Sequence, residues 1–225
     1  MALRELLLEH ADGRDLTKLS EYEAVGGYAS LRKAVTMERG AVLDELLAAN
    51  VRGRGGAGFP MGRKASFLPQ PEDTPNPIYL VANADESEPG TFKDREILLQ
   101  IPHMFVEGVA IAGYTIGASH AFIYLRGEYL TEFEILTAAL EEAREAGFVG
   151  PDVLGSGWGL TVVVHRGAGA YICGEETALL DSLEGRRGQP RTKPPFPASS
   201  RDRSTRTRRR RSRRWPARLR SSGRC

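Results

Sequence analysis

Three segments of the sequence combine residue types that could bind a phosphate-bearing ligand. The first is the glycine-rich run 53–62, which places five glycines in ten positions and is followed by Arg63 and Lys64. Glycine has no Cβ, so backbone N–H groups there can approach a phosphate closely, and Arg54 and Lys64 would add positive charge. The run lacks the Gly-Lys-Ser/Thr ending of a Walker loop, and it follows a predicted helix rather than a strand. A phosphate-binding loop and a flexible glycine-rich turn both fit this pattern.

The second segment is acidic and directly follows a predicted strand. Residues 78–82 form a short apolar run typical of a buried strand, and Asn83, Asp85, Glu86 and Glu88 come after it. Ligands of parallel α/β sheets bind beyond the carboxyl ends of the strands. These side chains could therefore hold ribose hydroxyls, the edge of a flavin ring or a metal ion. A solvated acidic loop is the alternative.

The third segment, 166–177, lies between a predicted strand at 160–164 and a predicted helix at 175–183. Its glycines and the start of that helix together form a candidate anion site. Glu175 and Glu176 also suit the positive end of the helix dipole, so simple capping of the first turn is the alternative.

The elements that must position these segments alternate between strands and helices. Apolar residues at helical spacing predict a helical segment over 1–50. Beyond it, strands are predicted at 78–82, 121–125 and 160–164, and helices at 102–117, 130–146 and 175–183. Strands separated by helices of this length require crossover connections, which give a mostly parallel sheet flanked by helices. The sequence therefore predicts an α/β, Rossmann-like fold with an N-terminal helical segment.

Charge is distributed unevenly between the body of the chain and its end. Residues 201–225 hold twelve arginines and one aspartate, a net charge of +11, so the formal charge of +2 for all 225 residues leaves −9 for 1–200. Because 199–225 has few apolar residues, it is predicted to be a disordered tail. We expect three parts: a helical segment 1–50, an α/β domain 51–198 and the arginine-rich tail 199–225.

Composition also excludes several classes of protein. Two cysteines do not make a disulfide scaffold, and no apolar run is long enough to span a membrane. A cytoplasmic protein without membrane insertion is expected.

Five motifs, in their order along the chain, resemble the family of NADH-binding, FMN-carrying F subunits of bacterial NADH-quinone oxidoreductase (respiratory complex I). They are GRGGAGFPMG at 53–62, ANADESEPGTFKDR at 82–95, PHMFVEG at 102–108, GAYICGEETALLDSLEG at 169–185 and KPPFPA at 193–198. With the segments between them, the resemblance covers about residues 15–198. The same core occurs in flavin diaphorase subunits of NAD-linked hydrogenases and formate dehydrogenases, which are the alternative within the enzyme class.

The resemblance implies an NADH dehydrogenase in which hydride passes from NADH to FMN and electrons then enter an iron–sulfur chain. Phe59, Phe67 and Phe196 match positions that stack against the NADH adenine, and Glu88 matches the acid at the reacting nicotinamide, the one catalytic position. The other cofactor-binding positions are Gly53, Arg54, Gly55, Gly56, Ala57, Gly58, Pro60, Met61, Gly62, Lys64, Asn83, Asp85, Glu86, Tyr171, Gly174, Glu175, Glu176 and Lys193.

The sequence departs from the family after residue 198. The family continues with an Asn-Asn-containing loop, a ubiquitin-like domain and a helical domain whose cysteines hold a [4Fe–4S] cluster. With Cys173 and Cys225 as its only thiols, this chain lacks the four ligands of that cluster, and no metal site is expected. The abrupt change to arginine-rich sequence is interpreted as a reading-frame shift that leaves a truncated domain.

The resemblance further implies partners and a location. The expected partners are other peripheral-arm subunits of complex I, notably the [2Fe–2S]-carrying E-type subunit, on the cytoplasmic side of the inner membrane. A hypothesis from another class is a nucleic-acid-binding protein, in which the arginines of 201–225 contact phosphate backbones non-specifically. The body has no recognition module, so such binding is expected only as a side effect of the tail.

Overall fold

Three parallel strands form the centre of the molecule in a computed structural model that describes residues 7–193 and 197. The strands are β1 (Tyr79–Ala84), β2 (His120–Leu125) and β3 (Thr161–Arg166), and they pair in the order β1-β2-β3. Their register sets Ala84, Leu125 and Arg166 side by side, so all three strands end together. The predicted α/β fold with a parallel sheet is confirmed, and the arginine-rich tail lies outside the described residues.

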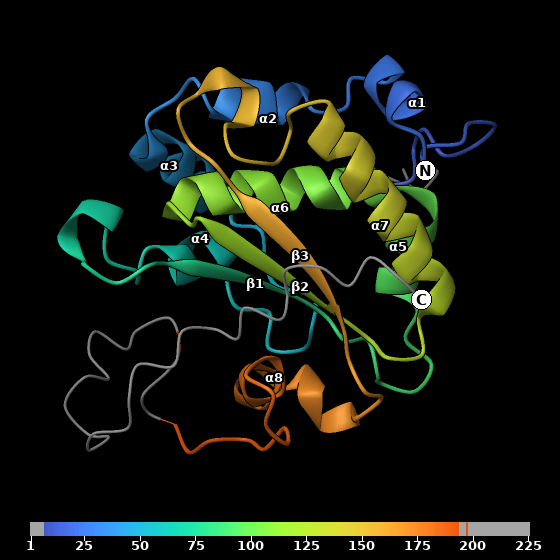
Figure 1. The fold of residues 1–225 in the computed structure, drawn as a ribbon, viewed down its shortest axis with the longest axis vertical. Helices are drawn as coiled ribbons and strands as arrows, with labels where there is room; N and C mark the ends of the chain where they lie inside the picture. Colours follow the sequence, from blue (N-terminus) through green and yellow to red (C-terminus); the bar gives the residue numbers. More distant parts are fainter. Residues whose placement is uncertain (1–6, 194–196, 198–225) are drawn as a thin grey trace.

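Helices cover the two faces of this sheet unequally. Helix α6 (Pro102–Ile116) and helix α7 (Leu130–Glu145) pack on one face, and α8 (Glu176–Leu183) lies against the other (Figure 1). Helix α5 (Lys93–Gln100) and α6 connect β1 to β2, and α7 connects β2 to β3, as crossovers between parallel strands require. The core is therefore the layer between β2 and the pair α6 and α7, with β2 buried from Ala121 to Leu125.

In the described part of the N-terminal segment, residues 7–18 form turns and bends, and the first helix begins at residue 19. Helices α1 (Leu19–Ala24), α2 (Ala29–Ala34) and α3 (Arg39–Ala49) follow, and each contacts α6. The contact centres on buried Glu107 of α6, whose carboxylate accepts hydrogen bonds from the Tyr22 hydroxyl (2.6 Å) and from the backbone N–H groups of Tyr28 (3.0 Å) and Leu31 (3.0 Å). Tyr28 adopts a left-handed backbone with φ 60°, which costs on the order of 1 kcal/mol. Its ring stacks on Phe148 at 3.7 Å, and this packing holds the strained conformation in place.

The remaining elements are short. Helix α4 (Met61–Ala65) follows the glycine-rich run, and single turns occur at η1 (Pro71–Asp73), η2 (Val153–Gly155) and η3 (Tyr171–Gly174). Neither α4 nor α5 was predicted from the sequence. Among the described residues no single helix is long and apolar enough to cross a membrane, and α5 and α6 reach that length and apolarity only as a pair bent by 103°.

Candidate functional site

Two of the predicted ligand-binding segments meet at the edge where the three strands end. The acidic segment continues β1, and the segment 166–177 continues β3. Asn83 donates a hydrogen bond from Nδ2 to the Gly174 carbonyl at 2.8 Å, and the Tyr171 hydroxyl donates to Glu88 Oε2 at 2.6 Å. The expectation that both segments lie at the carboxyl ends of the strands is therefore met.

Two lysines, Lys64 just after the glycine-rich loop and Lys193 near the end of the described chain, contact the start of α8 at this edge. Lys64 Nζ lies 3.4 Å from Glu176 Oε2, and Lys193 Nζ lies 2.7 Å from both Glu175 Oε1 and Glu176 Oε1. Two cations from separate parts of the chain thus converge on the start of α8. Burial opposes ionisation of both carboxyls, but the pKa of each is lowered, for Glu176 chiefly by Lys193 and Lys64.

Glu175 is also the N-cap of α8. Its carboxylate accepts hydrogen bonds from the backbone N–H groups of Thr177 (2.9 Å) and Ala178 (3.0 Å). Together with Lys193 these donors outweigh burial and lower the pKa of the Glu175 carboxyl to about 2. Glu175 therefore caps the first turn of α8, which was the alternative to ligand binding predicted from the sequence, and Glu176 contacts the two lysines.

The loop 53–62 is closed at its base and open at its tip. Gly53 N–H bonds the Phe59 carbonyl at 3.0 Å, and Met61 N–H bonds the Val51 carbonyl at 2.8 Å. At Gly55, Gly56 and Gly58, a Cβ would meet no atom within 4 Å, and all residues from 53 to 57 are exposed. The tip therefore leaves its backbone accessible, as a phosphate-binding loop requires.

Gly62 has a different role from the glycines at the tip. It is buried, and a Cβ there would lie 2.8 Å from backbone atoms of Leu46 and Leu47. Gly62 therefore allows α4 to pack closely on α3, which fixes the direction in which Lys64 leaves the loop.

The two described aromatic residues predicted to stack on adenine lie side by side on the surface. Phe59 and Phe67 are 46% and 47% exposed, and their ring centroids are 6.1 Å apart with a 48° angle between the planes. Both rings are therefore accessible to a flat ligand, on which an aromatic face can stack. Phe196, the third predicted stacking residue, lies outside the described residues.

Asp85 has an unsatisfied oxygen at this edge. Its Oδ1 accepts a hydrogen bond from the Ser87 hydroxyl at 2.9 Å, whereas Oδ2 is buried and accepts none from the described part of the chain. Burial raises the pKa of the Asp85 carboxyl, although Ser87 and the nearby Arg126 act in the opposite direction. A buried acceptor without a donor is rare, and it indicates a place where a ligand could supply one.

Glu86 points into the protein instead. Its carboxylate accepts hydrogen bonds from the backbone N–H groups of Asp94 (3.0 Å) and Arg95 (3.1 Å) at the start of α5, and from the Tyr129 hydroxyl (3.0 Å). Burial disfavours the charge, but these donors outweigh it and the pKa of Glu86 is lowered. A contact of Glu86 with a ligand stays a prediction, and its side chain already has a structural role.

Arg126, which was not predicted from the sequence, lies at the same edge directly after β2. Its Nη1 donates to the Glu86 carbonyl at 2.6 Å, and its backbone N–H bonds the Ala84 carbonyl at 3.1 Å. Arg126 directly follows the predicted strand 121–125, just as Asn83 directly follows the predicted strand 78–82. The same position relative to a strand end could have identified Arg126 from the sequence.

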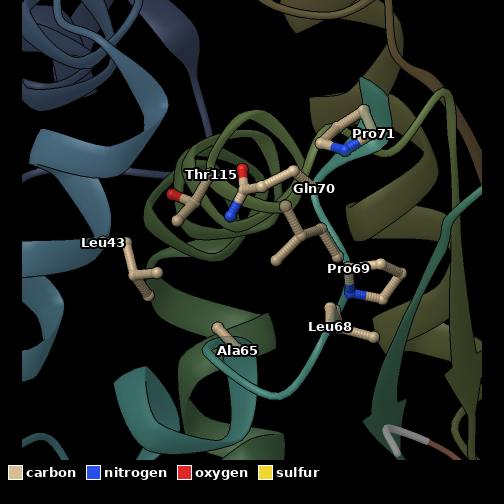
Figure 2. Close-up of a pocket in the computed structure, with 8 residues that line it drawn as sticks. Leu43, Ala65, Leu68, Pro69, Gln70, Pro71 and Thr115 are labelled. Atoms are coloured by element: carbon tan, nitrogen blue, oxygen red, sulfur yellow. The ribbon is translucent and has the colours of Figure 1, made fainter. Parts of the chain in front are cut away.

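Two hollows of the described structure lie away from this edge. A hollow of about 10 Å³ lies between α3, α4 and α6 (Figure 2), near the lower limit for one water molecule. A second, of about 230 Å³, lies between α8 and the beginnings of β1 and β2, at the opposite end of the strands. Neither hollow is lined by a predicted site residue.

The same part of the chain offers no metal site. Within residues 7–193 and 197, no group of three or more His, Cys, Asp or Glu side chains is arranged to hold a metal ion. Cys173 is buried and Cys225 lies outside the described residues.

Comparison with known proteins identifies the family. The model of the Nuo51 FMN-binding domain matches residues 46–201, which include the glycine-rich loop and both strand-end segments. The chain belongs to the Nuo51 FMN-binding domain family. It is 52% identical over 192 residues to the NADH-quinone oxidoreductase F subunit of Aquifex aeolicus (strain VF5), an alignment covering 85% of this chain and 44% of that protein. It is 57% identical over 180 residues to the corresponding protein of Streptomyces coelicolor, covering 80% and 40%.

The fold is shared with a solved member of a related assembly. A chain of the NAD⁺-reducing [NiFe]-hydrogenase in the H₂-reduced state superposes with a TM-score of 0.65 and 42% identity, covering 73% of this chain and 27% of that one. The chain thus spans less than half the length of the curated relatives it matches. The family resemblance expected from the five motifs is confirmed, whereas the roles of individual site residues stay predictions.

Proposed function

We propose that this chain binds FMN and NADH at the carboxyl edge of its sheet and aligns them for hydride transfer, as the flavin-carrying F subunit of an NADH-quinone oxidoreductase. The observation that carries the proposal is the joining of three separate segments at one edge, where Lys64 and Lys193 meet Glu176 beside the acidic loop. The family match over residues 46–201 supports FMN as the flavin.

The residues present suit FMN in three respects. The open tip at Gly55, Gly56 and Gly58 has room for a ligand against the backbone. The buried Oδ2 of Asp85 can accept a hydrogen bond from the ligand, and Lys64 and Lys193 provide positive charge for its phosphate. When bound, FMN accepts a hydride from NADH and passes single electrons onward.

The chain's own contribution is to bind and orient rather than to transfer protons. Lys64 and Lys193 would hold an anionic group, and Phe59 and Phe67 would lie against the adenine of NADH. Asn83 and Asp85 would offer an amide and a carboxylate to the flavin from the end of β1. Glu88, held by Tyr171, would lie near the nicotinamide. Holding two flat rings in contact is sufficient for direct hydride transfer, so none of these residues has to act as an acid or base.

Assembly and location belong to the same proposal. Relatives that are named as F subunits of NADH-quinone oxidoreductase support other subunits as partners. We propose a [2Fe–2S]-carrying E-type subunit as the direct partner, in a peripheral position on the cytoplasmic side of the membrane. Pull-down of a purified E-type subunit by the full chain would support this assembly, and absence of binding at micromolar concentrations would contradict it.

Titration of the full chain with FMN, followed by flavin fluorescence, tests the binding step. We expect saturable binding and a roughly tenfold higher Kd for Lys64→Gln, because a hydrogen bond to a charged group is lost. Lys33→Gln, on the exposed surface of α2, is the matched control and should change Kd less than about twofold, as expected for a surface position away from the site. Equal effects of both substitutions, or no binding by the wild type, would contradict the proposed site.

A second candidate function is a flavin diaphorase of an NAD⁺-reducing hydrogenase. The superposition on a chain of such a hydrogenase favours it, but at 42% identity that chain is less similar than the two oxidoreductase relatives at 52% and 57%. Both functions share the hydride step and differ in their partner. Competition for the chain between purified hydrogenase subunits and a purified E-type subunit would separate them.

The arginine-rich tail carries a separate proposal. Its charge of +11 favours non-specific binding to nucleic acid, with an affinity that falls steeply with salt. RNA binding by the full chain and by a chain ending at residue 198 should differ strongly at low salt and converge at high salt. Equal binding at low salt would contradict the proposal.

A further inference from the structure

The turn after β2 joins the two loops that carry the proposed site. This turn, Arg126–Gly127–Glu128, belongs to none of the predicted ligand-binding segments. Arg126 N–H bonds the Ala84 carbonyl at the end of β1 (3.1 Å), and the neighbouring Leu125 carbonyl accepts from Gly167 N–H after β3 (2.8 Å). The turn therefore lies between the acidic loop and the segment 166–177.

The Arg126 side chain fixes the acidic loop on one side of the turn. Its Nη1 donates to the Glu86 carbonyl at 2.6 Å, its Nε donates to Glu128 Oε2 at 3.2 Å, and its guanidinium lies 5.4 Å from the centroid of the Tyr129 ring. Tyr129 in turn donates to Glu86 Oε2 at 3.0 Å. Glu86 is thus held at its carbonyl by Arg126 and at its carboxylate by Tyr129.

Gly127 fixes the other side of the turn by close backbone packing. A Cβ at Gly127 would lie 2.5 Å from the Gly167 carbonyl oxygen and 2.6 Å from Gly169 N, so no side chain fits there. Gly169 has φ +79° and faces the Glu128 carboxylate, which would lie 3.3 Å from an added Cβ. Movement of this turn would therefore move both loops.

We infer that Arg126 is a positioning residue for the proposed flavin site: it orients the acidic loop so that Asp85 and Glu88 face the segment 166–177. The inference rests on the proposed function, but the geometry it describes exists in the chain without a ligand. Arg126 is suited to this task because one planar guanidinium can bond the Glu86 carbonyl and the Glu128 carboxylate at once. A lysine has a single ammonium and cannot reproduce both contacts in the same geometry.

Amide hydrogen exchange in the full, ligand-free chain tests the positioning directly. The reporters are amides whose hydrogen bonds depend on the acidic loop: Asp85 N–H to Asn83 Oδ1, Thr91 N–H to the Glu88 carbonyl, and Asp94 and Arg95 N–H to the Glu86 carboxylate. Arg126→Met keeps an apolar stem against Tyr129 and removes the donors. We expect exchange in 83–96 to accelerate on the order of tenfold, with exchange in α6 unchanged.

Two further variants make the result decisive. Arg144→Met removes an exposed arginine in the last turn of α7, where Arg144 pairs only with nearby Glu141 in the described structure, and it should leave exchange in 83–96 unchanged. Arg126→Lys restores one donor, so its exchange rate in 83–96 should lie between those of wild type and Arg126→Met. The inference is wrong if the exchange rate in 83–96 is the same in Arg126→Met as in wild type. It is also wrong if that rate is the same in Arg126→Lys as in Arg126→Met.

If Arg126→Met does not fold, Arg126→Lys is compared with wild type. Faster exchange confined to 83–96 in Arg126→Lys supports the inference, and equal exchange overturns it.

FMN binding gives a readout that separates this inference from the proposed function. If wild type binds FMN, Arg126→Met should raise Kd on the order of tenfold while the thermal midpoint of the ligand-free chain stays close to that of Arg144→Met. A wild-type chain that does not bind FMN would contradict the proposed function, whereas the exchange experiment would still decide the role of Arg126. Unchanged Kd in Arg126→Met would overturn the positioning role at the site.

Discussion

The contact between α6 and the N-terminal helices and the carboxyl edge of the sheet both depend on carboxylates, but they use them differently. Glu107 on α6 is buried and accepts three hydrogen bonds from Tyr22, Tyr28 and Leu31, all within the protein. At the strand edge, Glu88 is exposed and bonded by one hydroxyl, and Asp85 keeps one buried oxygen unbonded within the described structure. In the first region the protein itself supplies every hydrogen-bond donor to the carboxylate. In the second region carboxylate oxygens remain that could accept a hydrogen bond from a ligand.

This difference separates residues that hold the fold from residues that we propose to bind a ligand. A buried carboxylate with every donor in place stabilises one arrangement of helices. A carboxylate with an unsatisfied oxygen lowers stability in the absence of a ligand and gains a partner on binding. Glu86 shows that proximity to the site is not sufficient, because it lies between Asp85 and Glu88 and yet caps α5.

The largest expected effect comes from breaking the fold-holding carboxylate. Glu107→Gln places an NH₂ group against at least one buried N–H or O–H donor, so we expect the free energy of unfolding to fall by about 3 kcal/mol. Urea unfolding measures it. Glu141→Gln, which alters an exposed ion pair on α7, should change stability by less than about 0.5 kcal/mol. Equal losses in both variants would remove the contrast between the two regions.

Backbone packing at Gly62 gives the next effect and links the two regions. Gly62→Ala forces α4 away from the backbone of α3, and we expect a loss of about 2 kcal/mol together with weaker FMN binding, because Lys64 moves. Gly108→Ala on α6 is the matched control, since its Cβ would meet nothing within 4 Å. It should stabilise the chain by about 0.5–1 kcal/mol, as alanine favours a helix. Destabilisation by Gly108→Ala as large as by Gly62→Ala would show that close packing is not the cause.

Asp85, the carboxylate proposed to contact FMN, should behave in the opposite sense. Burial raises the pKa of the Asp85 carboxyl in the folded chain above its ordinary value of 3.8. The folded chain therefore loses stability as the pH rises from 3.8 through the raised pKa, because the carboxyl must ionise in a buried place. Asp85→Asn removes the buried charge and should stabilise the ligand-free chain at neutral pH by roughly 1 kcal/mol while weakening FMN binding. Loss of stability without loss of FMN binding would place Asp85 among the fold-holding residues.

The smallest effect concerns pH and the start of α8. The pKa of Glu175 is about 2 in the folded chain, below its ordinary 4.5, so its stabilising contribution is complete above about pH 4.5 and is lost as pH falls toward 2. Because the carboxylate is partly exposed, we expect the contribution to be on the order of 1 kcal/mol or less. Urea unfolding at neutral and acidic pH should show a smaller acid loss in Glu175→Gln than in wild type. Glu134→Gln, exposed on α7, should retain the full wild-type loss.

Much of the fold could be predicted because short apolar runs and helix signals are local. The runs at 78–82, 121–125 and 160–164 each became a strand, displaced or extended by one to two residues. Helix α5 was missed because its first turn, Lys93 to Glu96, is charged, and its single buried residue is Leu98. Residues 7–18 form turns although Leu3, Leu6 and Leu7 suggested a helix, and two of these three leucines lie outside the described residues.

The meeting of two predicted segments at the strand ends could be predicted, but the separate contacts of the residues within them could not. The rule that ligands bind beyond strand ends placed the acidic loop and the segment 166–177 at one edge. The capping of α5 by Glu86, the packing of Gly127 on Gly167 and the convergence of two lysines on Glu176 involve contacts that are not local in the sequence. Such contacts depend on the three-dimensional register of the strands, which no single segment encodes.

We propose that the carboxyl edge of this sheet binds FMN and presents it to NADH. The most direct test is anaerobic addition of NADH to the full chain after equilibration with FMN and removal of unbound flavin. We predict that the visible absorbance of the retained flavin bleaches and that Lys64→Gln retains less flavin than Lys33→Gln. Flavin that is not retained, or that is retained and stays unbleached with excess NADH, would contradict the claim.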